Sequence, residues 1–178
     1  MLITFEGIDG CGKSTQIHLL KQYLEDKGKH VQVYREPGGA HIAEEIRSLL
    51  LDSKKEISAI SELLLFSAAR AQLVKEKIIP DLDNGSVVIL DRFYDSTTAY
   101  QGYGRSVLPL KEIVALNKMA SHGLIPNLTF YLRLPLNLAL QRRSERAQDR
   151  MEGDRRAAQR AQRERPGAPP SLHRPRLP

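Results

Sequence analysis

A glycine-rich segment near the N-terminus carries the strongest chemical signal in the sequence. Residues 7–14 read Gly-Ile-Asp-Gly-Cys-Gly-Lys-Ser and match the pattern G-x-x-x-x-G-K-S/T, with an apolar run before it and a helical pattern after it. Glycines let consecutive backbone N–H groups point at anionic oxygens, and the lysine reaches the outer phosphates of a nucleoside triphosphate. The alternative is a glycine-rich turn that matches the pattern by chance, but such a turn would not need an apolar run before it and a helical pattern after it. The sequence therefore predicts a phosphate-binding loop made of Gly7, Ile8, Asp9, Gly10, Cys11, Gly12, Lys13 and Ser14.

Two residues inside this loop call for separate interpretations. No histidine neighbours Cys11 to activate its thiol, so we interpret Cys11 as a small loop residue and not as a nucleophile. The negative charge of a phosphate repels a neighbouring carboxylate, unless that carboxylate faces a sugar hydroxyl or a cation that binds the acceptor substrate. Asp9 is therefore either a ligand contact or an exposed loop acid, and the residue pattern leaves both open.

An apolar run that ends in an acid lies farther along the chain. Val-Val-Ile-Leu at 87–90 is followed by Asp91 and Arg92. An aspartate at the end of such a strand places a carboxylate near Mg²⁺, commonly through water, and the Ser14 hydroxyl is a further magnesium ligand. Strands often end in aspartate, so the interpretation depends on the glycine-rich loop. We expect a nucleoside triphosphate and Mg²⁺ as cofactors, with Ser14 and Asp91 as the metal site.

Three groups of residues indicate a second phosphorylated ligand. Phe66 and Arg70 lie four residues apart on a predicted helix, so a stacking ring and a hydrogen-bonding guanidinium share one face. The alternative is a core phenylalanine beside a surface arginine. The segment 35–39, Arg-Glu-Pro-Gly-Gly, follows a predicted strand end, where ligands of open α/β sheets bind. A plain turn would explain this segment equally well.

The third group follows Asp95-Ser96, which we expect to cap a short helix. That helix would place Thr97, Tyr100 and Gln101 on one side, where they could hydrogen-bond or stack with a ligand. An amphipathic surface helix is the alternative.

An arginine-rich helix is predicted near the end of the patterned region. It carries Arg142, Arg143, Arg146 and Arg150 with acidic residues between them. The spacing also fits a solvated helix with internal ion pairs. The functional interpretation is a lid whose guanidinium groups stabilise the charge that gathers when a phosphoryl group moves between two phosphates. A monophosphate acceptor is already anionic at neutral pH, so no catalytic base is required.

The elements that must position these residues alternate along the chain. Apolar runs predict strands at 2–5, 31–34, 87–90 and 128–132, and 3.6-residue periodicity predicts helices between them. These helices span 14–27, about 42–50, 58–79 with a stop at Pro80, 109–121, and 136 onward. Apolar strands without alternation indicate burial on both faces of a parallel sheet. The predicted fold is a doubly wound α/β domain of the P-loop NTPase type.

Composition limits the class of protein. The 178 residues are 41% hydrophobic and 27% charged, which is typical of one globular domain. No apolar run reaches the length of a membrane span, and the N-terminus lacks the basic region of a secretory signal. With Cys11 as the only cysteine, no intrachain disulfide can form. We therefore expect a cytoplasmic protein without a membrane partner.

The charge is concentrated at one end. Residues 1–152 hold 20 Lys+Arg and 19 Asp+Glu, whereas residues 153–178 hold seven arginines, two acids and five of the ten prolines. We expect a domain at 1–152 and a disordered Arg/Pro-rich tail at 153–178. The tail could be an arm for nucleic acid or an acidic partner, a solvated extension or out-of-frame translation, and we favour the last. Because no aromatic residue interleaves with these arginines, nucleic acid is not an expected partner.

The motifs together resemble bacterial thymidylate kinases. The resemblance rests on residues 5–10 and 12–15, then 35–39, Asp91-Arg92, 99–102 and 149–152, in that order. It implies phosphorylation of dTMP to dTDP by ATP and Mg²⁺ in a homodimer with a five-stranded parallel sheet. The family continues after its lid with a helix, a strand and a closing helix. Residues 153–178 do not supply them, which would leave the strand at 128–132 as an exposed edge.

The resemblance also assigns roles to single residues. It implies that Lys13 and the loop hold ATP, together with Thr15, Arg142 and Arg143, and that Asp9 binds the acceptor sugar. Phe66 would stack on thymine, Arg70 would read its edge and Arg92 would hold the acceptor phosphate. Gly10 after Asp9 resembles a subtype with lid arginines, for which Arg146 is the best candidate. The remaining acceptor-site residues it implies are Glu36, Pro37, Arg47, Thr97, Gln101 and Tyr100, the last disfavouring a 2′-hydroxyl.

Four alternatives remain at this stage. The chain could phosphorylate another nucleoside monophosphate, or it could be a catalytically impaired member that lacks the closing elements. A GTP-dependent switch is suggested by Asn117-Lys118, but Ala120 replaces the acid that reads guanine. A basic nucleic-acid-binding module would rest on the tail alone.

Overall fold

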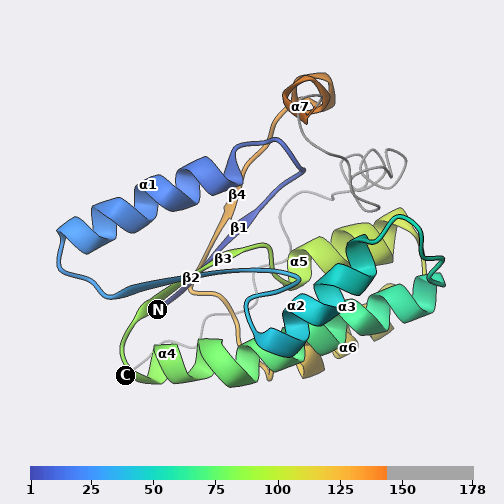
Figure 1. Cartoon of the computed structure of the whole chain (residues 1–178), viewed down its shortest axis with the longest axis horizontal. Helices are drawn as coiled ribbons and strands as arrows, with labels where there is room; N and C mark the ends of the chain where they lie inside the picture. The colour runs from blue at the N-terminus through green and yellow to red at the C-terminus, as the bar shows by residue number, and fades with distance from the viewer. Residues whose placement is uncertain (144–178) are drawn as a thin grey trace.

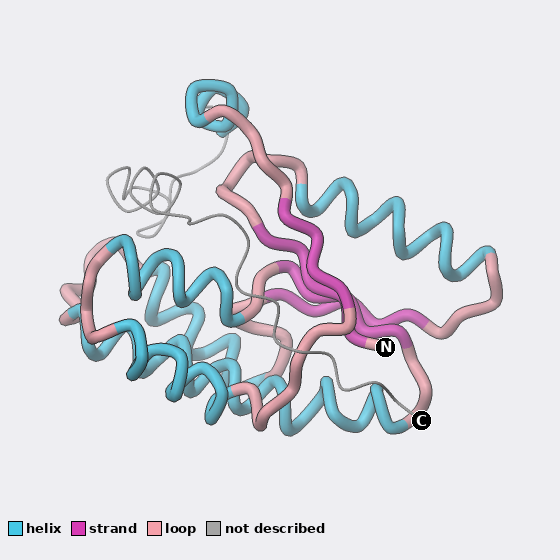
Figure 2. The backbone as a smooth tube through the Cα atoms, turned by 180° about the vertical axis from the view of Figure 1, so that it is seen from behind, coloured by secondary structure: helices cyan, strands magenta, loops and turns pink. Residues whose placement is uncertain are grey.

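A four-stranded parallel sheet forms the centre of the molecule. The computed structural model describes residues 1–143, and the expectations for Arg146, for residues 153–178 and for closing elements lie outside this range. The strands are β1 (Leu2–Glu6), β2 (Val31–Arg35), β3 (Val87–Asp91) and β4 (Leu128–Tyr131). Their order is β2-β3-β1-β4, and every pairing is parallel. The carboxyl ends of β1, β2 and β3 therefore share one edge of the sheet. Figure 2 shows the strands side by side in the middle of the molecule.

Helices connect the strands on both sides of the sheet. They are α1 (Lys13–Asp26), α2 (His41–Leu51), α3 (Ala59–Leu73), the π-helix η1 (Val74–Ile78), α4 (Ile79–Asp83), α5 (Tyr94–Thr97), the π-helix η2 (Thr98–Gly104), α6 (Leu110–Ala120) and α7 (Leu136–Arg143). Figure 1 shows α1 on one face of the sheet and α2, α3, α4 and α6 gathered on the other. The structure thus has the doubly wound α/β arrangement predicted for it.

The two faces of the sheet bury different sides of the same strands. Leu2 of β1 and Leu90 of β3 pack against α2, α3 and η1, whereas Ile3, Phe5 and Ile89 pack against α1. This alternation follows from the two-residue period of a strand. Glu6, at the end of β1, has the same parity as Leu2 and lies on the side that carries α5.

Two helix boundaries differ from the prediction. Pro80 does not end the long helix, because η1 immediately precedes α4 and Pro80 lies in the first turn of α4. The wide π-turn gives the proline ring room where an α-turn would clash. Asp95-Ser96 is not a cap, since α5 begins at Tyr94 after an extended Phe93. The Ser96 hydroxyl has another partner, described below.

Burial on both faces holds for β1 and for most of β3, but not for the outer strands. All five residues of β1 are buried, while β4 is exposed along its length and β2 is mixed. Leu128 and Phe130 are 42% and 39% exposed. The exposed edge predicted at 128–132 is therefore present among the described residues, where β4 pairs only with β1. Within residues 1–143, no helix combines the length and apolarity needed to cross a bilayer.

Candidate active site

The glycine-rich loop joins β1 to α1 at the carboxyl edge of the sheet. Gly7 has φ 146° and Gly12, the residue before α1, has φ 101°. A Cβ atom on Gly7 would lie 2.6 Å from the Leu132 carbonyl oxygen and 2.8 Å from Cys11 Sγ. A side chain therefore cannot be accommodated at position 7 without displacing the backbone. Cys11 is buried and forms no disulfide among the described residues.

Lys13 folds back along this loop. Its Nζ donates to the carbonyl oxygens of Gly7 and Ile8 at 3.2 and 3.3 Å, and lies 3.9 Å from Asp9 Oδ1 and 4.0 Å from Asp91 Oδ1. Burial lowers the pKa of Lys13, and the nearby Arg92 acts in the same direction. The ammonium group is thus held at the mouth of the loop between two carboxylates.

The two predicted metal ligands lie side by side. Ser14 Oγ donates to Asp91 Oδ2 at 3.5 Å, although 77 residues separate them in the sequence. Asp91 Oδ1 is buried and has no hydrogen-bond donor among the described residues. A hydroxyl and a carboxylate with a spare oxygen suit Mg²⁺, which takes few protein ligands and keeps waters or phosphate oxygens. The residues present therefore fit the metal.

A cavity of about 130 Å³ opens beside the loop. Each of the ten residues predicted for the acceptor site lines it: Asp9, Glu36, Pro37, Arg47, Phe66, Arg70, Arg92, Thr97, Tyr100 and Gln101. The fold brings them together from the first loop, the end of β2, α2, α3, the end of β3, α5 and η2. Leu51, Phe93 and Ser96 complete the wall; the sequence analysis did not assign these three to the cavity.

Arg92 lies where this cavity meets the loop. Its Nη2 donates to Asp9 Oδ1 and its Nη1 donates to Ser96 Oγ at 2.9 Å. The guanidinium also faces the Tyr100 ring, 5.4 Å from its centroid. The backbone at Arg92 is left-handed, with φ 74°, which is uncommon for a residue with a side chain. The surrounding contacts therefore hold this arginine in an unfavourable backbone conformation.

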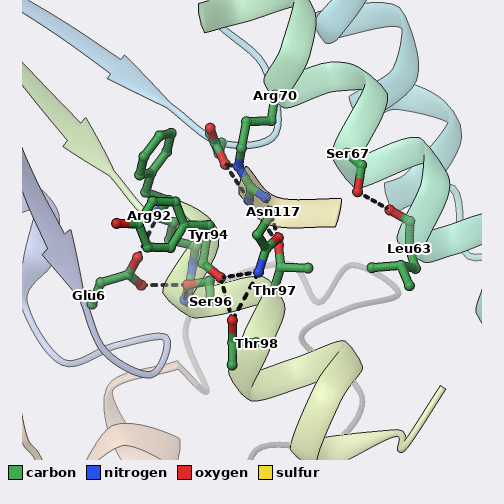
Figure 3. Close-up of polar contacts among 12 residues, drawn as sticks. Glu6, Leu63, Ser67, Arg70, Arg92, Tyr94, Ser96, Thr97, Thr98 and Asn117 are labelled. Atoms are coloured by element: carbon green, nitrogen blue, oxygen red, sulfur yellow. Dashed lines mark hydrogen bonds and ion pairs between the residues drawn. The ribbon is translucent and has the colours of Figure 1, made fainter. Parts of the chain in front are cut away.

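Arg70 is almost fully buried at the opposite end of the cavity, with 2% of its surface exposed. Its Nε donates to Glu36 Oε2 at 2.8 Å, its Nη1 to Asn117 Oδ1 at 3.1 Å and its Nη2 to Thr97 Oγ1 at 2.8 Å. Figure 3 shows Arg70 descending from α3 toward Thr97 and Asn117. Burial raises the pKa of Glu36, and the ion pair with Arg70 opposes this shift.

Other charged residues position the wall of the cavity. Glu62, buried in α3, accepts a hydrogen bond from Gln101 Nε2 at 3.0 Å and lies 3.1 Å from Arg105 Nε. Arg47 Nη1 donates to the Pro37 carbonyl oxygen at 2.9 Å. These contacts tie α2, α3 and η2 together around the cavity.

Glu6 and Asn117 are two further residues beside the cavity to which the sequence assigned no role in it. Glu6 accepts hydrogen bonds from the Phe93 backbone N–H at 2.8 Å and from Ser96 Oγ at 2.6 Å. Asn117 Nδ2 donates to the Tyr94 carbonyl oxygen and to Thr98 Oγ1. The only signals in the sequence were the place of Glu6 just before the loop and the Asn117-Lys118 pair.

A wider groove of about 790 Å³ lies on the other side of the loop, between α1 and β4. Four of the predicted ATP contacts line it, namely Cys11, Gly12, Thr15 and Arg142, along with the apolar side chains of Leu19 and Phe130. Arg143 is the last residue of α7. The structure therefore has two openings at the loop, one lined by loop residues and Arg142 and one lined by the residues predicted for the acceptor site.

Comparison with known proteins identifies the family. The Thymidylate kinase family model matches residues 5–166. The chain is 56% identical to the thymidylate kinase of Chlorobaculum parvum over 148 residues, which cover 83% of this chain and 68% of that protein. It is 57% identical to the thymidylate kinase of Chlorobaculum tepidum over 143 residues, covering 80% of this chain and 66% of that protein. The chain thus spans about two thirds of the length of these relatives.

A solved structure agrees with these sequence matches. The crystal structure of thymidylate kinase from Ehrlichia chaffeensis matches with a TM-score of 0.71 and 41% sequence identity. The match covers 80% of this chain and 81% of that one.

Proposed function

The chain belongs to the thymidylate kinase family, whose reaction is the ATP-dependent phosphorylation of dTMP to dTDP, and we propose that Lys13, Arg92 and the acceptor cavity divide this reaction among them. Relatives at 46–57% identity support that function. Another monophosphate kinase, a GTP-dependent switch, a nucleic-acid-binding module and an impaired family member are not favoured.

One observation carries the proposal: Asp9 joins the two phosphate-binding cations. Its Oδ1 lies 3.9 Å from Lys13 Nζ and accepts a hydrogen bond from Arg92 Nη2. A triphosphate held by Lys13 and an acceptor phosphate held by Arg92 would therefore meet end to end beside this carboxylate. Such an arrangement supplies the positioning and charge neutralisation on which phosphoryl transfer depends.

The cavity suits a pyrimidine nucleotide. Phe66, Arg70 and Thr97 line the wall. Phe66 would stack on the base, and Arg70, whose Nη2 donates to Thr97 Oγ1, would face the edge of the base. Tyr100 lies over Arg92, beside the place where the sugar of the acceptor would sit. Its ring would disfavour a 2′-hydroxyl there.

The chemistry requires no protein base. The acceptor phosphate has a second pKa near 6 and is anionic at neutral pH. Lys13 and Arg92 bring the two anions together and neutralise part of their charge. Mg²⁺, which Ser14 and Asp91 would hold, supplies further neutralisation of the triphosphate when bound.

Three further assignments belong to this proposal. Arg142, Arg143 and Arg146 would supply the lid guanidinium groups, with Arg142 already lining the groove beside the loop. The protein would act in the cytoplasm, where ATP and dTMP are present. It would also form a homodimer, because α3 and α6 pack together and each exposes an apolar pair four residues apart, Ile60 and Leu64 on α3 and Leu110 and Val114 on α6.

The direct test is ADP formation by the full chain with ATP, Mg²⁺ and a series of acceptors. We expect kcat/KM to be highest for dTMP, lower for dUMP and much lower for dCMP and dGMP, because Arg70 donates hydrogen bonds and suits a carbonyl on the base edge. Turnover no higher with dTMP than without acceptor, together with unimpaired ATP binding, would contradict the proposal.

A further inference from the structure

Glu6 is a buried carboxylate that lies outside the acceptor cavity and yet faces the residues that shape it. Only 1% of its surface is exposed, and it is not among the residues that line the cavity. Burying an ionisable carboxylate is unfavourable unless it has partners. Both partners of Glu6, Phe93 and Ser96, belong to the turn that follows Arg92.

We propose that Glu6 is a positioning residue for Arg92, acting through the Ser96 hydroxyl to align the guanidinium with the acceptor phosphate. The inference rests on the proposed function, in which Arg92 holds that phosphate. It assigns a role in the reaction to a side chain that touches neither nucleotide.

The hydrogen bonds form a directed chain. Arg92 Nη1 donates to Ser96 Oγ at 2.9 Å, and Ser96 Oγ donates to Glu6 Oε2 at 2.6 Å. The second carboxylate oxygen accepts from the Phe93 backbone N–H at 2.8 Å. Figure 3 shows the link from Glu6 to Ser96 beneath the side chain of Arg92. One carboxylate therefore orients both the start of α5 and the hydroxyl that holds Arg92.

Arg92 needs such a support because its backbone is left-handed, with φ 74°. Asp9, Ser96 and Tyr100 all contact its guanidinium. Asp9 lies on the phosphate-binding loop and faces the reacting groups, whereas Ser96 is anchored from the sheet by Glu6. The Ser96 contact is thus the one that can persist while phosphates bind beside Asp9.

A purely structural role makes a different prediction from a positioning role. If Glu6 only stabilised the turn through Phe93, its loss would weaken the binding of any ligand of the cavity. If Glu6 positions Arg92, its loss would weaken the binding only of ligands that carry a phosphate. Thymidine and dTMP differ only in that phosphate, so the ratio of their dissociation constants isolates the contribution of Arg92.

The test measures equilibrium binding of dTMP and thymidine to the full chain and to Glu6→Gln, Ser96→Ala and the double variant. We expect each single variant to reduce the preference for dTMP over thymidine about tenfold, as for a lost hydrogen bond to a charged group. The double variant should show nearly the same preference for dTMP as the single variants, because both changes break the same chain of hydrogen bonds. The KM for dTMP should rise while the KM for ATP stays unchanged.

Thr4→Val is the matched control. Thr4 is buried in the same strand and hydrogen-bonds to Thr129 at 2.9 Å, away from the cavity. It should leave the dTMP preference at the wild-type value. Three results in Glu6→Gln would overturn the inference. They are an unchanged preference for dTMP over thymidine, an equal loss of affinity for both ligands, and a higher affinity for dTMP caused by removal of the negative charge. A wild-type chain that binds thymidine and dTMP equally would refute the proposed role of Arg92 itself.

Discussion

Asp9 shows how a single carboxylate can organise a site that binds anions. It lies between Lys13 and Arg92, the two cations to which the proposal assigns the two phosphates. The residue pattern left open whether Asp9 was a ligand contact or an exposed loop acid. It is 30% exposed and lines the acceptor cavity, so the first interpretation is favoured.

Lys13 should be indispensable to the reaction but not to the acceptor cavity. Lys13→Ala removes the ammonium group at the mouth of the loop, and kcat/KM should fall by about a hundredfold or more. Thymidine affinity should be unchanged, because Lys13 does not line the cavity. A coupled ADP assay and a binding titration measure the two effects. Lys21→Ala serves as the control, since Lys21 lies on the same helix in an exposed pair with Glu25.

Glu6 should make the stability of the protein depend on pH. Burial raises the pKa of Glu6 to about 7 from 4.5, with Asp95 adding to the shift and Arg92 opposing it; Tyr94 and Tyr100 also face the carboxylate. The folded state binds the proton of Glu6 more tightly than the unfolded state does. The resulting stabilisation of the folded protein is fully present below pH 4.5 and is lost as pH rises through 7.

The Glu6→Gln variant lacks this titration. From pH 4.5 to pH 7.5, the free energy of unfolding of the wild type should fall relative to that of the variant by about 3 kcal/mol. Urea unfolding of both proteins at several pH values measures the difference. Parallel pH profiles would show that Glu6 does not titrate in this range.

At the level of elements, α5 is a short helix held from several directions. Glu6 of β1 holds the Phe93 N–H and Ser96, Arg70 of α3 holds Thr97, and Asn117 of α6 holds the Tyr94 carbonyl. Four residues of helix cannot be stable by themselves. These contacts therefore explain how α5 keeps Arg92 at one end of the cavity and Thr97 at the other.

Asn117→Leu tests this view of α5. The change removes the acceptor of the buried Arg70 Nη1 and the donor to the partly buried Tyr94 carbonyl. We expect a loss of about 2 kcal/mol in the free energy of unfolding and weaker thymidine binding. Denaturant unfolding and a thymidine titration measure the two effects. Lys118→Ala, an exposed neighbour on α6, should change neither, and wild-type thymidine affinity in Asn117→Leu would contradict the interpretation.

At the scale of the whole molecule, the glycine-rich loop and the acceptor cavity lie together at the carboxyl edge of the sheet, where the proposal brings the two nucleotides together. The helices that form the acceptor side also expose apolar residues. Leu64 on α3 and Val114 on α6 are 52% and 53% exposed. Such exposure over neighbouring helices is typical of an interaction surface.

The proposed homodimer predicts a specific effect of charge on these helices. Leu64→Glu or Val114→Glu should shift the sedimentation coefficient from that of a dimer to that of a monomer, because a carboxylate would be buried in the interface. Ile125→Glu is the control, since Ile125 is 68% exposed in the loop before β4. If only Ile125→Glu dissociated the dimer, the interface would lie elsewhere. A monomeric wild type would contradict the proposed homodimer.

The sequence was sufficient wherever the determining contacts are local. The loop at 7–14 follows from its own spacing, because glycines and a helix start are enough to form a phosphate cradle. The strand and helix order followed from apolar periodicity. The ten acceptor residues were inferred from a family resemblance, and the structure gathers all of them in one cavity.

Contacts between distant residues required the folded chain. Arg70 hydrogen-bonds Glu36 and Asn117, which are 34 and 47 residues away. Glu6 meets Phe93 across 87 residues, and Pro80 stays within a helix because η1 widens the turn before it. No local pattern encodes such pairings, since they arise when strands at the same edge of a parallel sheet bring their carboxyl ends together.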